Sequence, residues 1–311
     1  MKNNAIVRII LFSVTIAVLL AILVVGLTLR QWGWRLKSIA TSGEESMAAA
    51  SPEAYSTAQP GTSVSVNSKE VREMEINWAA GSILIQPADV EDITISESTP
   101  SSEKYAMQWR HSGSKLSIDF CEDTTLHGFG IHTNLKKDLT ILVPRDFALD
   151  SLEVDAASAK LKVQQLTIRE VDINTASGEC AFTDCALDEL DVDTASGDIR
   201  FQGTLNALDC EAASACVYAE LDNVPSRISM DSMSGSLNLT LPEDAGFTLS
   251  MDTMSGKFSS DFATTSRNGN HICGDGGCLV KMNAMSGDVS IHKGHSPAHE
   301  TPEVHETEHH D

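Results

Sequence analysis

The chain has 311 residues, enough for one to three domains of ordinary size. Its 44 acidic side chains outweigh 22 basic ones, giving a formal charge of −22 and an isoelectric point near 4.7. This excess of acid argues against nucleic acid as a partner, because binding to a phosphate backbone needs clustered Lys and Arg.

Residues 9–29 are predicted to form a transmembrane helix. The stretch holds 21 residues, of which only three are polar, and a helix of this length spans roughly 30 Å, the thickness of a bilayer core. A short basic N-terminus, residues 1–8, precedes it, and two tryptophans follow it, where indole rings favour the membrane boundary. The apolar run is longer than the core of a cleaved signal peptide, so we expect an uncleaved, single-pass span embedded in the lipid bilayer.

Residues 30–66 are predicted to be a juxtamembrane segment and a flexible stalk, because Ser, Thr, Ala and Pro predominate there. The positive-inside rule counts two Lys or Arg before the span and three after it, which by itself would place the C-terminal domain in the cytoplasm. The repeats that follow favour a cell-membrane protein with an extracellular C-terminal domain, and this is the orientation that we expect.

A repeat of about 20 residues dominates the chain beyond the stalk. Its clearest copy reads LDVDTASG, and its serines lie 19, 19, 18, 20, 21 and 31 residues apart. The copies begin at Leu152, Val171, Leu190, Leu208, Ile228, Leu249 and Val280, with a degenerate one at Met74. Such a period is typical of a solenoid, in which one unit is too small to bury its own apolar face.

Apolar and polar residues alternate within each unit, which indicates strands rather than helices. The glycine that follows the serine lets the chain take a positive φ at a bend between two strands. The bends are expected at Ser177, Gly178, Ser196, Gly197, Ser234, Gly235, Ser255, Gly256, Ser286 and Gly287. We therefore predict an all-β fold over residues 67–291, a parallel β-solenoid resembling a β-helix, preceded by one transmembrane α-helix.

Stacking the units in sequence order, with rungs about 4.8 Å apart, lines up apolar residues into interior columns. One column would be Val154, Ile173, Val192, Cys210, Met230, Met251 and Met282. A second would be Leu161, Cys180, Ile199, Val217, Leu237, Phe258 and Val289. These shared columns would supply the driving force for folding.

The Ser-Gly repeats, the segment 139–144 before them and the closing segment 274–291 resemble the bacterial putative-adhesin domains of unknown function. The resemblance covers about residues 67–291 and implies a β-solenoid at the cell envelope, commonly attached to a membrane span. It carries over no catalytic residue, because the family has no settled activity. Ala159 and Ala215 replace the bend glycine in two units and depart from the pattern.

A column of Asp, Asn and Glu residues precedes the bends. Its members Asp193, Asp231 and Asp252 are weak candidates for Ca²⁺ ligands, because this cation takes six to eight oxygens. A solvated outer face is the favoured interpretation, since no loop with EF-hand spacing occurs.

Residues 292–311 are predicted to be a disordered tail rich in His and Glu. Its histidines are weak candidates for holding Zn²⁺ or Ni²⁺, although a solvating tail without a ligand is favoured. They are His292, His295, His299, His305, His309 and His310. We expect no cofactor.

Two sets of sulfur-containing residues leave alternatives open. Cys273 and Cys278 could form a disulfide if the domain is exposed to an oxidising environment. Met233, Met254 and Met285 could form an adaptable binding strip, but filling of a widening core is favoured.

Signatures of catalysis are missing, including the nucleophile elbow, the zinc-protease helix and the phosphate-binding glycine loop. We therefore predict a non-enzymatic binding or scaffolding module on the cell surface, acting in adhesion or envelope stress, with an unknown envelope protein or glycan as its partner. The alternatives are a carbohydrate-active solenoid enzyme, which would show carboxylates clustered with Arg or Lys in one groove, and a membrane-bound regulator that faces the cytoplasm.

Overall fold

The computed structural model describes residues 55–59, 61–98, 105–121 and 135–294. The strands are β1 (Ser56–Thr57), β2 (Val64–Val66), β3 (Glu73–Ala88), β4 (Ile93–Glu97), β5 (Gln108–Ser112), β6 (Lys115–Asp119), β7 (Lys137–Pro144), β8 (Ala148–Gln164), β9 (Thr167–Ser177), β10 (Cys180–Ser196), β11 (Ile199–Leu221), β12 (Arg227–Leu241), β13 (Phe247–Ser255), β14 (Phe258–Ser260), β15 (Thr265–Arg267), β16 (Asn270–Cys273), β17 (Cys278–Ser286) and β18 (Val289–Lys293). The fold is all-β and mostly parallel, as predicted. The expected span at 9–29 lies outside the described residues, and within them no helix could cross a bilayer.

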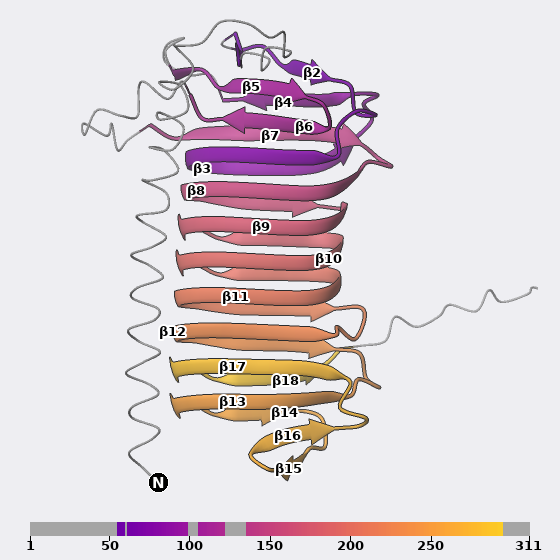
Figure 1. The fold of residues 1–311 in the computed structure, drawn as a ribbon, viewed down its shortest axis with the longest axis vertical. Coiled ribbons are helices and arrows are strands. Elements are labelled where there is room, and N and C mark those ends of the chain that lie inside the picture. The colour runs from indigo at the N-terminus through magenta and orange to yellow at the C-terminus, as the bar shows by residue number, and fades with distance from the viewer. Residues whose placement is uncertain (1–54, 60, 99–104, 122–134, 295–311) are drawn as a thin grey trace, which may run out of the picture.

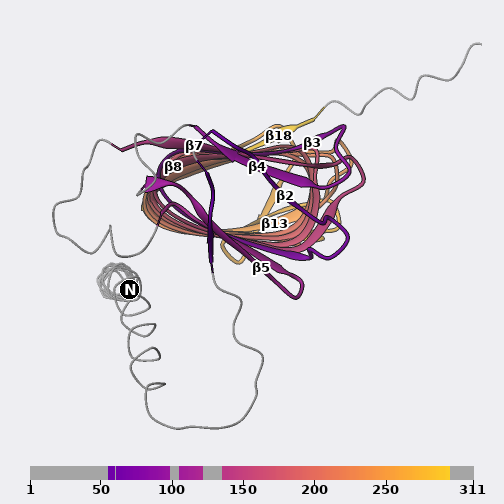
Figure 2. The ribbon, with the colours of Figure 1, turned by 90° about the horizontal axis from the view of Figure 1, so that it is seen from above.

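The repeat units wind into a stack of coils, each lying on the next (Figure 1). Strands β8, β9, β10, β11 and β12 pair in parallel and in the register that the repeat predicts, so that Val154 lies opposite Ile173 and Cys210 opposite Met230. Seen from above, the coils run around an oval interior (Figure 2). Hydrogen bonds link all 18 strands into one continuous sheet, and we call its two opposed sides the two sheets of the stack. Each coil completes the hydrogen bonds of its neighbours and shares their apolar columns.

The last coil is out of sequence order. β17 pairs with β12 on one side and with β13 on the other, so β17 and β18 lie between β12 and the β13–β14 coil that precedes them in the chain (Figure 1). Met282 therefore stacks between Met230 and Met251. The prediction that the coils stack strictly in sequence order is wrong at this step, because the units share one pattern and either order buries the same apolar columns.

The N-terminal end repeats this arrangement. β3 pairs with β8 on one side and with β6 and β7 on the other, so a later segment forms the coil outside β3. The degenerate copy at Met74 is in register with the next coil, since Met74 lies opposite Leu152. β5 and β4 then pair in antiparallel fashion with β6 and β7, which covers the edge of the parallel stack at this end.

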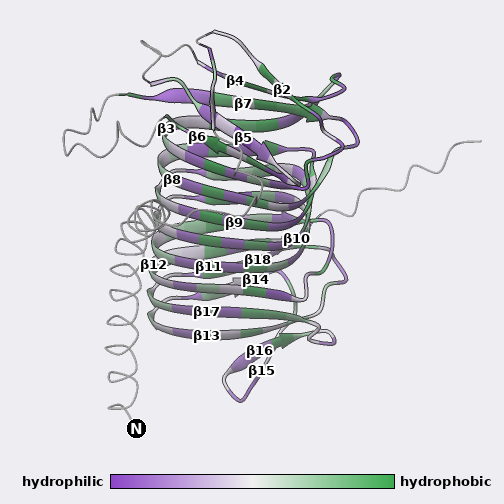
Figure 3. Ribbon diagram, turned by 45° about the horizontal axis from the view of Figure 1, so that its top comes forward, coloured by the Kyte–Doolittle hydropathy of each residue, from purple (hydrophilic) through white to green (hydrophobic). Residues whose placement is uncertain are grey.

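Apolar and polar residues alternate along every coil, as the banding in Figure 3 shows. Five members of the first interior column and the inserted Met282 are 2% exposed or less. These residues are Val154, Ile173, Val192, Cys210, Met230 and Met282. Met251 belongs to the outermost coil and is only partly buried. The core is thus continuous along the stack and thins at its C-terminal end.

Both ends of the domain differ from the expected boundaries. The stalk was expected to reach residue 66, but β1 and β2 lie within residues 55–66, and Ala58 and Val66 are buried in the core. The tail was expected to begin at 292, but His292 and Lys293 belong to β18. The local composition of these segments does not indicate strands, because each segment is stabilised by pairing with strands that are distant in sequence.

The glycines at the bends are required by close approach more than by conformation. Gly178 and Gly197 have φ values of 146° and 140°, as expected, whereas Gly235, Gly256 and Gly287 are not in the left-handed region. A Cβ on Gly287 would lie 1.8 Å from the carbonyl oxygen of Gly235, and one on Gly197 would lie 1.9 Å from that of Gly178. The bends therefore pack backbone against backbone along the stack.

Alanine takes the place of this glycine in two coils. Ala159 and Ala215 are both buried, with exposures of 3% and 4%. Strands β8 and β11 run through these positions without a break, whereas the chain leaves the strand conformation after Ser177 and Ser196. β12 also runs unbroken through Gly235, so the continuous strand does not depend on alanine, and the stacking is the same in both cases.

Candidate functional site

The outer face of one sheet carries two neighbouring columns of acidic and amide side chains, which we call the acidic face. It is formed by β3, β8, β9, β10, β11, β12, β17 and β13, whose registers align the repeat positions. One column holds Glu75, Glu153, Asp172, Asp191 and Asp209. The other holds Asn77, Asp155, Asn174, Asp193, Glu211, Asp231, Asn283 and Asp252.

Asparagines interrupt the second column and donate hydrogen bonds to carboxylates beside them. Asn283 donates to Asp231, and Asn77 donates to Asp119 of the outer coil at 2.8 Å. Between Asn174 and Asn283 the column contains three carboxylates in successive coils, namely Asp193, Glu211 and Asp231. Since neighbouring strands lie about 4.8 Å apart, like charges are concentrated in this run.

The ionisation of this run is perturbed. Burial is the main cause that raises the pKa of Asp193 to about 6, and the adjacent carboxylates of Glu211 and Asp172 add to it. Burial and neighbouring acids also raise the pKa values of Asp191 and Glu211. Close packing of acids on a partly buried sheet surface disfavours their charged forms.

A few cations pair with carboxylates of the acidic face or beside it. The ion pairs are Lys115 with Glu75 at 3.0 Å, Arg227 with Asp209 at 2.6 Å and with Glu189 at 3.4 Å, and Lys281 with Asp231 at 3.5 Å. The opposite sheet carries a more even mixture, in which Arg200 binds Glu179 and Asp198 and lies 4.5 Å from the ring centre of Tyr218. Columns of carboxylates in successive coils are therefore a feature of the acidic face.

Three methionines extend the acidic face with an apolar strip. Met233, Met285 and Met254 occupy the same repeat position on β12, β17 and β13, and they are 37%, 38% and 58% exposed. The expectation that they fill a widening core is wrong. Residue Met230 points inward, so a residue three positions further on the same strand points outward.

The acidic column does not gather the three predicted metal ligands. Glu211 lies between Asp193 and Asp231, and Asn283 lies between Asp231 and Asp252, so successive candidates are two coils apart. No group of three His, Cys, Asp or Glu side chains within the described residues is arranged to hold a metal ion. The solvated face is the interpretation that this geometry favours.

Of the six candidate histidines of the tail, only His292 lies within the described residues. Nδ1 of His292 lies 3.1 Å from a carboxylate oxygen of Asp261 on the neighbouring coil, and both side chains are exposed. The remaining candidates, at 295, 299, 305, 309 and 310, lie outside the described residues. His292 therefore has a place on β18, and metal binding by the tail stays a prediction.

The predicted pairing of Cys273 with Cys278 is not formed. Both thiols are free, and both residues lie opposite Phe247, one on β16 and the other on β17. With β13 between them they are separated by two strand spacings, roughly 10 Å, which exceeds the reach of a disulfide. Burial raises the pKa of Cys278 to about 12, so this thiol is an apolar core residue.

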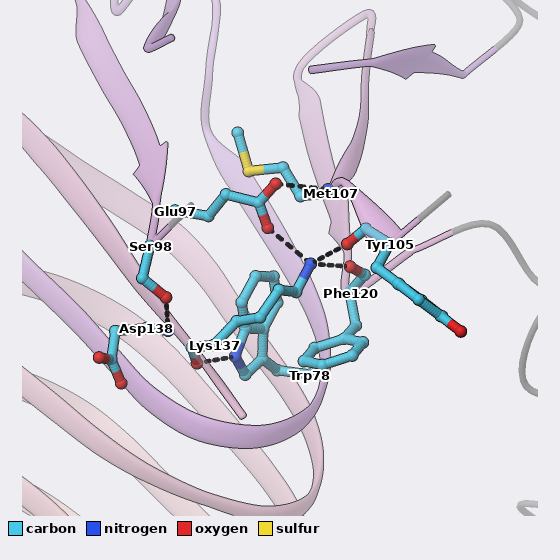
Figure 4. Close-up of polar contacts among 8 residues, drawn as sticks. All are labelled: Trp78, Glu97, Ser98, Tyr105, Met107, Phe120, Lys137 and Asp138. Atoms are coloured by element: carbon cyan, nitrogen blue, oxygen red, sulfur yellow. Dashed lines mark hydrogen bonds and ion pairs between the residues drawn. The ribbon is translucent and has the colours of Figure 1, made fainter. Parts of the chain in front are cut away.

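Sequence reasoning missed a buried lysine at the N-terminal end of the stack (Figure 4). Nζ of Lys137 contacts the carboxylate of Glu97 at 2.5 Å and donates to the carbonyl oxygens of Tyr105 and Phe120. The indole nitrogen of Trp78 donates to the carbonyl oxygen of Lys137 at 3.0 Å. Lys137 is 2% exposed, and burial lowers its pKa.

All three ammonium hydrogens of Lys137 have acceptors, so the cluster in Figure 4 ties strands together rather than presenting a reactive amine. It joins the end of β4, the end of β6 and the start of β7. A single lysine at the start of a strand carries no sequence signal for this role, because its acceptors come from distant segments.

The chain was compared with curated proteins and with solved structures. Among curated proteins, none matches this chain. A crystal structure of a putative cell adhesion protein from Clostridium sporogenes aligns with 76% of this chain and 100% of its own, at 10% identity and a TM-score of 0.41. That of a putative adhesin from Bacteroides fragilis aligns with 75% and 96%, at 12% identity and a TM-score of 0.41. A putative lipid binding protein from Parabacteroides distasonis aligns with 75% and 96%, at 11% identity and a TM-score of 0.33.

The sequence of the repeats matches a known family. The family model described as Toastrack DUF4097 matches residues 71–205 and again residues 160–292. The two matches overlap and together cover most of the chain, including every coil of the parallel stack. The chain therefore belongs to the toastrack DUF4097 family.

Proposed function

We propose that this chain is a membrane-anchored, non-catalytic binding module of the cell surface, in which a β-solenoid engages its partner through the acidic face. The predicted span at 9–29 would anchor it, and the predicted stalk would hold the domain away from the lipid. The role would be in adhesion or in the response to envelope stress.

The acidic face is the observation that carries this proposal. Carboxylates follow one another along both of its columns, as Asp172, Asp191 and Asp209 do in three successive coils, and acids outnumber the basic residues that pair with them. A flat and strongly negative surface attracts positively charged surfaces over long range and raises the rate at which they associate. The partner would accordingly be an envelope protein or glycan that presents positive charge.

The methionine strip at 233, 285 and 254 suits the same role. Thioether side chains adapt to the shape of an apolar partner, and here they stand exposed beside acidic residues. A surface with charged and apolar parts would combine electrostatic attraction with contact burial. The strip thus extends the binding area toward the C-terminal end of the stack.

The carboxylates of the acidic face stand on the outer, partly exposed surface of the stack. The carbohydrate-active alternative calls for carboxylates and basic residues within one groove. A cavity of about 410 Å³ does occur at the N-terminal end, but no carboxylate lines it. These features support binding over hydrolysis.

Adhesion of cells that display the full chain would test the proposal. We expect display to increase adhesion to envelope-coated surfaces, and the gain to fall as salt rises from 50 to 500 mM, because surface charges are screened. The variant Asp191→Asn, Asp193→Asn, Glu211→Gln should reduce the gain at least tenfold. A control on the opposite sheet, Glu179→Gln, Asp198→Asn, Glu220→Gln, removes the same number of charges and should leave it unchanged.

The proposal fails if display leaves adhesion unchanged or if the two triple variants behave alike. Turnover of a polysaccharide by the full chain, lost on changing a carboxylate cluster, would establish the enzymatic alternative. Protease treatment of intact cells would test the orientation separately: an extracellular domain is digested, whereas a protected one places it in the cytoplasm.

A further inference from the structure

The methionine strip places three thioether side chains side by side on neighbouring coils. Met285 of β17 lies between Met233 of β12 and Met254 of β13, because the serines that follow these methionines are paired in register. Neighbouring strands are about 4.8 Å apart, so the three side chains leave the sheet in a row roughly 10 Å long. In stack order they are 37%, 38% and 58% exposed, so solvent reaches all three.

The packing of the stack does not explain these methionines. In the same coils a second methionine, three positions earlier, points inward and fills the space beneath the bend. The methyl groups of Met230 and Met282 lie 3.0 and 3.1 Å from where a Cβ on Gly235 and Gly287 would fall. At the position of the outer methionine four other coils carry alanine, namely Ala157, Ala176, Ala195 and Ala213. Alanine is therefore sufficient for the fold at this position.

Exposed large apolar side chains are rare on this molecule. Six occur within the described residues, and three of them form the methionine strip. The other three are Tyr218, Val224 and Leu279, which occupy different positions in the coils. A cluster of exposed apolar side chains marks a site of interaction. Here the members share one chemical group, a neutral and polarisable thioether.

Two carboxylates lie beside the thioethers. Asp231 and Asp252 come two positions before Met233 and Met254, so they project from the same face of their strands. Lys281 pairs with Asp231 at 3.5 Å, whereas Asp252 is exposed and forms no ion pair with any described residue. A cation bound by uncharged thioethers keeps its full charge, which nearby carboxylates would offset. The surroundings of the strip therefore favour a cation.

We propose that the methionine strip binds one Cu(I) ion through the sulfur atoms of Met233, Met285 and Met254. Thioethers are soft ligands that select Cu(I), whereas Zn²⁺ is bound by thiolate, imidazole and carboxylate groups. Methionine is unbranched and has three rotatable bonds, so the two outer side chains can lean toward Met285 and meet one ion above it. This inference goes beyond the adhesive role, because it requires no partner surface and holds for either membrane orientation.

Competition with the Cu(I) chelator bathocuproine disulfonate would test the proposal, with the full chain in lipid nanodiscs under anaerobic conditions. We expect Met285→Leu, which removes the central ligand, to weaken Cu(I) binding by the strip at least tenfold. Met282→Leu is the matched control, because Met282 lies on the same strand but is 0% exposed, and it should leave binding unchanged. Both substitutions nearly conserve the volume of the side chain.

Other soft or nitrogen ligands of the chain are separated by a triple variant. Met233→Leu, Met254→Leu, Met285→Leu removes the thioethers of the strip and keeps all seven cysteines and all ten histidines. It should bind one Cu(I) fewer than the unchanged chain. Thioethers do not titrate, so this difference should persist at pH 5, where imidazoles are protonated. In spectra of the chain labelled with ¹³C-methyl methionine, Cu(I) should shift three of the ten methyl signals.

Three results would overturn the proposal. The triple variant could bind as many Cu(I) ions as the unchanged chain, Met282→Leu could weaken binding as much as Met285→Leu, or the difference could vanish at pH 5, which would assign the ion to histidines. Leucine keeps the strip apolar, so the triple variant should retain the adhesion proposed above. Loss of Cu(I) binding and loss of adhesion are therefore observed separately.

Discussion

Asp193 lies at the most crowded point of the acidic face. Its neighbours along the column are Asn174 and Glu211, so one side offers an amide and the other a second carboxylate. Burial is the first cause of its pKa of about 6, and the surrounding acids are the second. At neutral pH the ionised Asp193 carboxylate therefore lowers the free energy of unfolding, because ionisation is harder in the folded protein than in the unfolded chain, where the pKa is ordinary.

We predict that Asp193→Asn stabilises the fold at pH 7.5 by on the order of 1 kcal/mol, a value reduced by solvent screening. A raised pKa means that the folded state holds the proton more tightly, so the cost disappears as pH falls through about 6 toward 4. The gain from Asn should shrink over that window. Urea denaturation of the full chain between pH 4 and 8 measures it.

Glu220→Gln is the control, since Glu220 is exposed on the opposite sheet surface. It should change the free energy of unfolding little at any pH in this range. A gain from Asp193→Asn that persists unchanged at pH 4 would show that the carboxylate is not the source of the cost.

Lys137 is the opposite case, because its buried positive charge is paired with the carboxylate of Glu97. The side chains of Lys137 and Glu97 are 1% and 3% exposed, and Nζ of the lysine lies 2.5 Å from Oε2 of the glutamate. Lys137→Met would leave the Glu97 carboxylate buried without its cation, and the expected loss in free energy of unfolding is about 3–5 kcal/mol. Urea denaturation of the full chain checks the value.

The double variant Lys137→Met, Glu97→Gln should recover part of that loss. Glutamine removes the buried charge and can still accept the hydrogen bond that Met107 donates to Glu97 at 2.8 Å. If the double variant is less stable than Lys137→Met alone, the charge is not the cause of the defect.

At the scale of the element, the bend decides how closely the coils approach. A Cβ on Gly287 would fall 1.8 Å from the carbonyl oxygen of Gly235, and neither backbone can move without disturbing the ladders beside it. We predict that Gly287→Ala lowers the free energy of unfolding by at least about 2 kcal/mol. Gly277→Ala is the matched control, because the atoms nearest to its Cβ would be those of the Asp275 side chain, from 3.3 Å outward, and not backbone.

Thermal and urea unfolding of the two variants would separate them. Equal stabilities would mean that the bend can open at little cost, and the close backbone approach would then have no energetic weight.

Period-two patterning is sufficient to predict strands, interior columns and register, because each unit repeats the same local arrangement. The same parity places Met233 outward once Met230 is inward, so the exposed strip was readable from spacing. The order of the last two coils could not be predicted in this way, because the units that begin at 249 and 280 have the same pattern and could exchange places. The 31-residue gap did contain a sign of an inserted hairpin, because Asn-Gly is typical of hairpin turns. In the structure Asn268 and Gly269 both have positive φ and form the turn between β15 and β16.

The features described at the candidate site could likewise be predicted only where they belong to the repeat. The acidic column follows from the repeat, whereas the cavity and the Lys137 cluster join segments that are distant in sequence. Arg110 lines the cavity and stacks on Tyr55, and Lys137 contacts Glu97 across 40 residues. Contacts of this kind arise from the turns at the N-terminal end, where no repeat constrains the chain.

At the scale of the molecule, the stack is nearly one-dimensional, because each coil contacts only its neighbours. Charge follows the same geometry, with acids on one sheet and a mixture on the other. Stability should accordingly depend on the position of a coil in the stack rather than on its position in the chain. β17 pairs along both edges, whereas β13 pairs with β16 over only three residues on its outer edge.

We predict that hydrogen exchange follows stack order. Peptides covering 278–293 should exchange more slowly than those covering 247–260, although they lie nearer the C-terminus of the chain, because β17 and β18 are enclosed between coils. The β9–β10 coils serve as the protected reference. Mass spectrometry of the full chain in nanodiscs measures both peptides in one experiment. Faster exchange of 278–293 than of 247–260 would mean that the last coil lies at the outside of the stack, in sequence order.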